Sequence, residues 1–195
     1  MRLFGPLYDR CLRWAGHPHA EAYLAGISTA ESIFFPVPPD VMLAPMVLAR
    51  PHRWLRLVLV CTLASVLGGL IGYALGAFAL DLVLPLLERA GKLEAYLEVQ
   101  HLFQRYGFWI VFLAGFTPIP YKVFTLASGA TGIGWIPFLL ASLVGRGGRF
   151  ALVGGLVAVG GTRVAPLLRR YVEGIGWAMV LVVAVGLAVW EWRGA

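Results

Sequence analysis

Five ionisable side chains lie inside long apolar stretches of the 195-residue chain. They are two carboxylates and three cations: Glu31, Asp40, Lys122, Arg146 and Arg149. A charge left unpaired at the centre of a membrane helix costs roughly 2.5–3.5 kcal/mol on insertion scales, so such residues mark sites of binding, transfer or pairing. The set carries one positive charge in excess, which suits a single anion, and guanidinium groups match the geometry of phosphate.

The same five charges support two interpretations. Asp40 with Lys122, and Glu31 with one of the arginines, could be permanent ion pairs that lock two halves of the protein together. Alternatively, the pairs open and close as a substrate or a proton passes, because a carboxylate in apolar surroundings can bind and release a proton. Residue types and spacing leave both interpretations open.

The two carboxylates flank a proline-rich interruption formed by Pro36, Pro38 and Pro39. Prolines end a helix, so residues 21–50 divide into two apolar arms. At about 1.5 Å per residue, neither arm crosses a hydrocarbon core of about 30 Å. We therefore expect a re-entrant hairpin over 21–50 with its tip inside the membrane, and a single kinked spanning helix is the alternative.

A second interruption, at Pro118, Pro120 and Tyr121, lies within residues 107–132. The two interruptions align when the chain is slid along itself, which pairs Phe34 with Phe116, Pro36 with Pro118, Pro38 with Pro120 and Asp40 with Lys122. An apolar helix long enough to span a membrane follows each hairpin, at 54–80 and 135–161. With one spanning helix between them, the two hairpins enter from opposite faces. We therefore expect an inverted repeat whose tips meet near the midplane.

The remaining segments complete the prediction of an all-α integral membrane protein. Hydrophobic residues make up 59% of the chain and charged residues 13%, which is about half the charged fraction of a soluble domain. We expect amphipathic interfacial helices within 1–19 and 81–106, the second of which is broken at Pro85 and Gly91. A C-terminal transmembrane helix is expected within 166–195.

Charge distribution and residue types exclude several function classes. The net charge of +6 comes largely from short basic segments between the helices, which indicates membrane topology with a cytoplasmic N-terminus and not nucleic-acid binding. The four histidines lie outside the apolar spans, so Ser128 has no base, and no metal-binding motif is present. We expect no enzyme activity, metal or cofactor. A stripe of small residues allows close helix packing, within the chain or in a homo-oligomer, and consists of Ala64, Gly68, Gly72 and Gly76.

Several motifs together resemble one family. They are Glu31 before the Pro-Val-Pro-Pro-Asp turn at 36–40, Gly-Tyr-Ala-Leu-Gly at 72–76, Tyr-Gly-Phe at 106–108, and a Phe-Thr-Pro turn at 116–118 that leads to Ala-Ser-Gly-Ala at 127–130. This pattern resembles the DedA membrane proteins, which carry the VTT domain, also called the SNARE-associated Golgi protein domain. The phrase Phe-Thr-Pro-Ile-Pro-Tyr-Lys at 116–122 is most similar to the YqaA subgroup. The resemblance covers about residues 20–165.

The resemblance implies two opposed re-entrant hairpins and a protein that moves lipids across the bacterial inner membrane. The implied activity is that of a flippase or scramblase for a polyprenyl phosphate or a phospholipid, with proton coupling at intramembrane carboxylates. A proton-coupled transporter of a small solute, or a structural or assembly role in membrane integrity, are the alternatives.

The family's acidic pair maps onto Glu31 and Asp40. Its second turn usually carries two arginines, where this chain has Gly115 and Tyr121. Three other cations are expected to substitute for them, unless this subgroup handles a different substrate: Lys122, Arg146 and Arg149.

Overall fold

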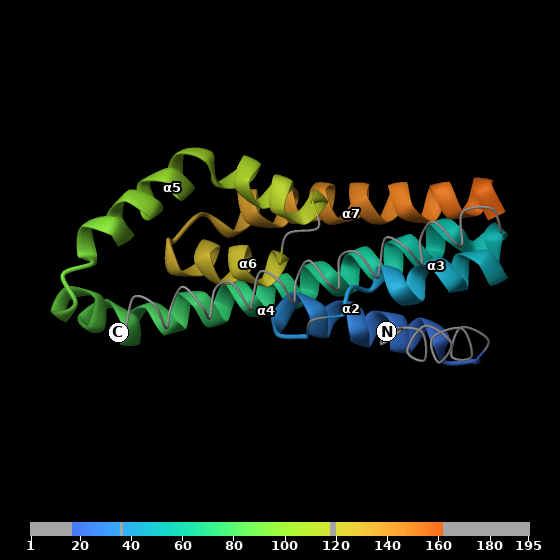
Figure 1. Cartoon of the computed structure of the whole chain (residues 1–195), viewed down its shortest axis with the longest axis horizontal. Helices are drawn as coiled ribbons and strands as arrows, with labels where there is room; N and C mark the ends of the chain where they lie inside the picture. The colour runs from blue at the N-terminus through green and yellow to red at the C-terminus, as the bar shows by residue number, and fades with distance from the viewer. Residues whose placement is uncertain (1–16, 36, 118–119, 162–195) are drawn as a thin grey trace, which may run out of the picture.

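The computed structural model of the chain describes residues 17–35, 37–117 and 120–161. Every regular element in these ranges is a helix, so the predicted all-α class is confirmed for them. The expected C-terminal helix within 166–195 and most of the expected interfacial segment at 1–19 lie outside the described residues. The elements, drawn in Figure 1, are α2 (Ala20–Ile33), α3 (Asp40–Ala49), the short 3₁₀ helix η1 (Pro51–Arg53), α4 (Trp54–Arg89), α5 (Leu93–Phe116), α6 (Tyr121–Ala130) and α7 (Trp135–Gly160).

Helices α2 and α3 run in opposite directions along one end of the molecule (Figure 1). Helix α2 ends at Ile33, and α3 begins only after Pro38 and Pro39. Proline is tolerated at the start of a helix because the N–H group that it lacks would have no partner in the helix there. The carbonyl oxygen of Pro39 accepts a hydrogen bond from the N–H group of Met42 at 3.0 Å. The predicted break between the carboxylates is therefore confirmed.

Helix α4 is the longest element. Its 36 residues extend about 54 Å at 1.5 Å per residue, well beyond the predicted end at residue 80. The predicted break at Pro85 is wrong, because the helix passes through Pro85 and leaves the carbonyl of the exposed Asp81 without its helical donor. The chain turns instead at Gly91, whose φ of 64° suits glycine. The segment 81–106 is thus shared between the end of α4 and the start of α5.

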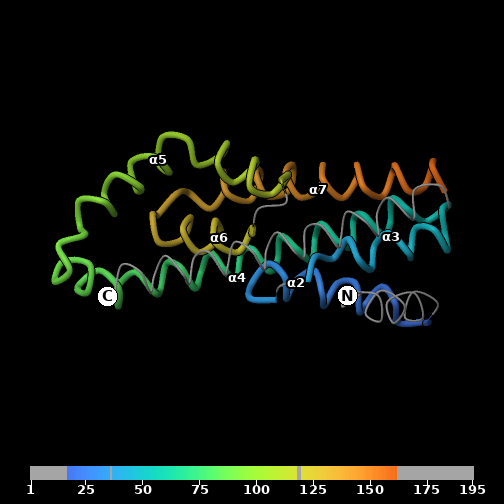
Figure 2. The backbone as a smooth tube through the Cα atoms, in the orientation of Figure 1, coloured from blue at the N-terminus to red at the C-terminus, as the bar shows by residue number. Residues whose placement is uncertain are grey.

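Helices α5 and α6 form a second pair that reaches the middle of the molecule from the other end, as the tube in Figure 2 makes plain. Helix α7 then runs beside α4 towards the end of the molecule where α3 lies (Figure 1). A hydrogen bond from Lys122 Nζ to the carbonyl oxygen of Phe34, at 3.2 Å, joins the turn of the second pair to the turn of the first. The two turns therefore meet, as the aligned interruptions predicted.

The glycine stripe of α4 serves packing inside the chain. A Cβ on Gly68 would collide with Thr29 of α2, whereas a Cβ on Gly76 would collide with the backbone of Leu126 in α6. The first half of α4 therefore contacts α2 and the second half contacts α6. The absence of side chains on this face lets both helices approach α4 closely.

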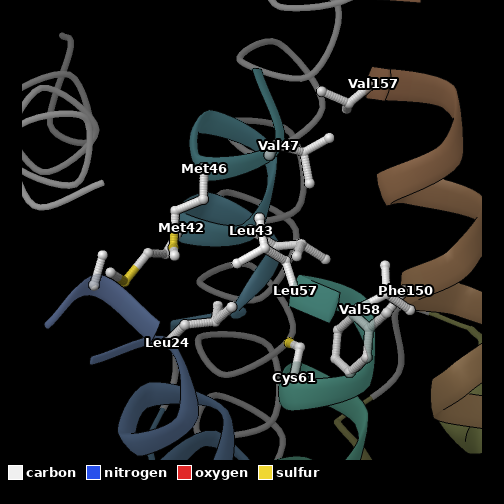
Figure 3. Close-up of a cluster of buried hydrophobic side chains, with 12 residues drawn as sticks. Leu24, Met42, Leu43, Met46, Val47, Leu57, Val58, Cys61, Phe150 and Val157 are labelled. Atoms are coloured by element: carbon white, nitrogen blue, oxygen red, sulfur yellow. The ribbon is translucent and has the colours of Figure 1, made fainter. Parts of the chain in front are cut away.

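Two apolar clusters fill the interior, one for each helix pair. The first joins α2, α3, α4 and α7, and Figure 3 labels its residues Leu24, Met42, Leu43, Met46, Val47, Leu57, Val58, Cys61, Phe150 and Val157. The second lies between α5, α6 and α7 and consists of Phe103, Val111, Tyr121, Ile133, Phe138 and Ala141.

Two stretches in the described part of the chain are long and apolar enough to cross a membrane, Pro51–Arg89 and Trp135–Gly160. Large apolar side chains stay exposed along both, including Leu63 at 60% and Leu156 at 58%. Apolar surface of this extent indicates contact with lipid or with another protein.

Candidate functional site

Arg146 lies at the junction of the two apolar clusters. It projects from α7, is 1% exposed, and forms an ion pair with Glu31 of α2. Its Nε donates to Ser65 Oγ of α4 at 2.6 Å. The guanidinium carbon lies 5.0 Å from the ring centre of Tyr121 and 4.8 Å from that of Phe150, one ring from each cluster. The prediction that Glu31 pairs with an arginine is confirmed.

A small group of hydroxyls supports this arginine. Ser65 Oγ lies 2.8 Å from Ser32 Oγ, which belongs to the residue after Glu31. The phenol of Tyr121 donates to Ser142 Oγ at 2.5 Å, which holds the ring beside the guanidinium. Side chains from α2, α4, α6 and α7 therefore converge on one buried cation, and its charge and aromatic contacts both contribute to stability.

Arg149, one helical turn further along α7, contacts both turns. Its Nη2 donates to Asp40 Oδ2 at 2.5 Å, and its Nη1 donates to the carbonyl oxygen of Thr117 at 2.9 Å. Asp40 stands at the start of α3, and Thr117 directly follows α5. One guanidinium therefore holds the two interruptions together. The other oxygen of Asp40, Oδ1, is buried and has no hydrogen-bond partner within the described ranges.

Lys122 does not pair with Asp40, so this predicted pair is wrong. Its ammonium donates to the Phe34 carbonyl, and among the described residues it forms no ion pair. Two equivalent positions of a repeat touch each other only when both lie close to the symmetry axis that relates the two halves. The Asp40 carboxylate instead pairs with Arg149 of α7. Lys122 therefore carries the positive charge that is in excess in this cluster.

The two proline-rich turns differ in the backbone conformation of the proline that precedes the next helix. Pro39 adopts a helical conformation before α3, whereas Pro120 is extended before α6. Tyr121 opens α6 but is fully buried beneath Arg146, so it serves as a packing residue. Two of the predicted turn residues lie outside the described part of the chain, Pro36 and Pro118.

Several contributors escaped the sequence analysis. Ser32 and Ser65 are small polar residues inside apolar helices, which is a weak signal on its own because such hydroxyls often bond to their own helix. Phe150 and the Thr117 carbonyl carry no sequence signal at all. In the described ranges, no group of three or more His, Cys, Asp or Glu side chains could hold a metal ion.

A family model described as the VTT domain matches residues 37–159. The chain belongs to the VTT-domain (DedA) family. The matched region contains four of the five charges of the site, and Glu31 precedes it.

Two similar proteins match nearly the whole chain. An uncharacterized protein of Haemophilus influenzae is 40% identical over 185 residues, which cover 95% of this chain and 96% of the relative. An uncharacterized protein of Histophilus somni is also 40% identical over 185 residues and is covered to 97%. No solved structure matches the chain.

Proposed function

We propose that this VTT-domain protein is a transporter that moves an anionic lipid, a polyprenyl phosphate or a phospholipid, across the bacterial inner membrane as a flippase or scramblase. A cluster of charges in the middle of an apolar protein, where two opposed helix pairs meet, supports this proposal. The sequence at 116–122, which resembles the YqaA subgroup, supports the proposal that the chain belongs to that subgroup.

The two helix pairs would be re-entrant hairpins in an inverted arrangement. Helices α2, α3 and α6 have 14, 10 and 10 residues, so they extend about 21, 15 and 15 Å, less than a hydrocarbon core of about 30 Å. Helix α5 has 24 residues and extends about 36 Å, and in this proposal only its apolar end, residues 107–116, enters the core. Helices α4 and α7 span the membrane. The basic segment 50–56 covers η1 and the first residues of α4, which favours a cytoplasmic location for this end and for the N-terminus under the positive-inside rule.

The main observation in support of this proposal is the positive charge of Lys122, which has no carboxylate partner among the described residues. Both arginines of the cluster have carboxylate partners, whereas the half-buried Lys122 ammonium bonds, within the described ranges, to the neutral carbonyl of Phe34 alone. An ammonium is a good phosphate binder. The head group of the lipid would take the place of this carbonyl, which also frees one contact between the two turns.

Exposed aromatic side chains next to the two turns favour a lipid over a small solute. Phe34, whose backbone carbonyl bonds to Lys122, directly follows α2 and is 69% exposed, and Phe116, the last residue of α5, is 41% exposed. Such rings offer apolar surface to the hydrocarbon next to a bound head group, whereas a small hydrophilic solute gains nothing from them.

Proteoliposomes that contain a fluorescent phospholipid or polyprenyl phosphate test the proposal through chemical quenching of the outer leaflet. Lys122→Gln removes a charge-assisted interaction of about 1.5–3 kcal/mol and should slow lipid movement about 10- to 100-fold, while Lys122→Arg should retain it. Lys92→Gln is the matched control, because Lys92 is exposed in the loop between α4 and α5. Lipid movement that is equally fast in Lys122→Gln and in the control would refute the proposal and favour a structural role.

A further inference from the structure

The two carboxylate–arginine pairs differ in how firmly the arginine is held. The side chain of Arg146 is 2% exposed, and its guanidinium is enclosed by Ser65, Glu31 and two aromatic rings. The side chain of Arg149 is 14% exposed and, among the described residues, bonds to Asp40 and to a backbone carbonyl. Each of the two guanidinium groups uses two of its five N–H donors in these bonds, so the difference lies in exposure and in the aromatic rings around Arg146. The remaining donors of Arg149 are therefore the more accessible to an incoming phosphate.

The carboxylates differ in the surroundings of their second oxygen. Each bonds through one oxygen: Glu31 Oε2 accepts from Arg146 and lies 3.5 Å from the hydroxyl of Ser32, and Asp40 Oδ2 accepts from Arg149. The Asp40 side chain is the more buried of the two, 9% against 15% exposed, and its buried Oδ1 has no partner in the described part of the chain. A buried polar atom without a partner is a place where a native structure departs from full hydrogen bonding, and such places often serve function.

We propose that Asp40–Arg149 is the exchangeable pair of the transport cycle, while Glu31–Arg146 stays closed as an anchor. The inference rests on the proposed lipid transport and assigns the roles within that site. An anionic head group that reaches Lys122 next replaces Asp40 at Nη2 of Arg149. Arg149 keeps its bond to the Thr117 carbonyl, so the first turn is released from α7 and the second is not.

The exchange balances in charge. The displaced carboxylate binds one proton at Oδ1 and forms an O–H bond, and no other covalent bond changes. One proton and one negative charge of the head group enter together, so the net charge of the cluster stays the same. When the head group leaves, Asp40 loses the proton and returns to Arg149.

The ionisable groups on the elements around Asp40 set this equilibrium. They are Glu31 on α2, Cys61 on α4, Lys122 on α6 and Arg149 on α7. Glu31 keeps its own cationic partner throughout the exchange, and Cys61 is fully buried in the first apolar cluster. Asp40 is therefore the group in this set that loses its partner when the head group binds.

Two isosteric variants of the full-length protein separate the roles, Asp40→Asn and Glu31→Gln. Lipid movement in proteoliposomes is measured as a function of pH, and thermal unfolding of the purified protein is measured with and without decyl phosphate as a soluble anionic probe. Asp40→Asn should abolish the pH dependence and increase the thermal stabilisation by decyl phosphate, because an amide competes poorly for Arg149. Glu31→Gln should lower the unfolding temperature and leave both the pH profile and the effect of the probe as in the wild type.

The proposed exchange at Asp40 would be refuted if Glu31→Gln, and not Asp40→Asn, changed the pH profile and the stabilisation by decyl phosphate, or if both variants changed them equally. If Glu31→Gln does not fold, Ser65→Ala loosens Arg146 while it retains the ion pair, and it should likewise leave the pH profile intact. The two proposals fail in different ways. Wild-type protein that moves no lipid refutes the proposed function, even where Asp40→Asn binds decyl phosphate more tightly. Lipid movement with indistinguishable amide variants refutes only the assignment of roles.

Discussion

Removal of one partner from the buried pair of Glu31 and Arg146 should destabilise the protein far more than removal of one partner from a surface pair of the same chemistry. Breaking a buried ion pair from one side costs about 3–5 kcal/mol, because the remaining charge is left without compensation. Arg146→Gln also loses contacts with two rings, worth about 0.5–2 kcal/mol each, but this loss is common to both backgrounds of a double-mutant cycle and cancels. We therefore expect Glu31→Gln and Arg146→Gln to couple by about 2–3 kcal/mol.

The coupling is measured by reversible unfolding of the four proteins in mixed detergent micelles. The chain offers its own control in the pair Arg56–Glu21, whose oxygen and nitrogen lie 2.9 Å apart while the Arg56 side chain is 66% exposed. Exposed pairs of this kind couple by about 0.2–1 kcal/mol. A coupling between Glu31 and Arg146 that does not exceed the control would contradict the placement of Arg146 as a compensated, buried charge.

Three further predictions concern packing, hydrogen bonding and lipid contact. Gly129→Leu should prevent folding, since even a Cβ there collides with the backbone of Tyr73, whereas Gly26→Ala meets open space and should leave the yield of folded protein unchanged in size-exclusion chromatography. Tyr121→Phe keeps the ring beneath the guanidinium but loses its hydroxyl bond, and should destabilise the protein by about 0.5–1.5 kcal/mol in the same unfolding assay. Leu67→Arg places a charge on an exposed face of α4 and should reduce membrane insertion in a glycosylation-mapping assay by about 2.5–3.5 kcal/mol, and unchanged insertion would argue against lipid contact at this face.

The turns could be predicted from the sequence because proline acts locally. Pro38, Pro39 and Pro120 determine where a helix can start without reference to the rest of the chain. The close helix packing at the glycine stripe could also be predicted, because a helix face of small residues lets another backbone approach closely. Both features depend on spacing along one segment only.

The partner of Asp40 could not be predicted in this way. The aligned turns paired Asp40 with Lys122, whereas the observed partner, Arg149, depends on which face of α7 passes the turns. The aromatic contacts of Arg146 likewise bring together rings from two clusters, which no local pattern encodes. The end of α4 was misplaced because an amphipathic extension and a separate interfacial helix have similar sequence patterns, and Pro85 suggested a break that the exposed helix end tolerates.

The pairing of Glu31 with Arg146 also has a consequence for biosynthesis, because the arginine is translated long after its carboxylate. The arginine follows its carboxylate by 115 residues, a delay of roughly 6–23 s at about 5–20 residues per second. During that interval the nascent segment of α2 and α3 holds two acidic side chains whose cationic partners have not yet been translated. In the proposed re-entrant arrangement, we expect this segment to reach its final depth only after α7 has been synthesised. Truncated chains that end before residue 146 should hold the first hairpin in a shallower, protease-accessible position.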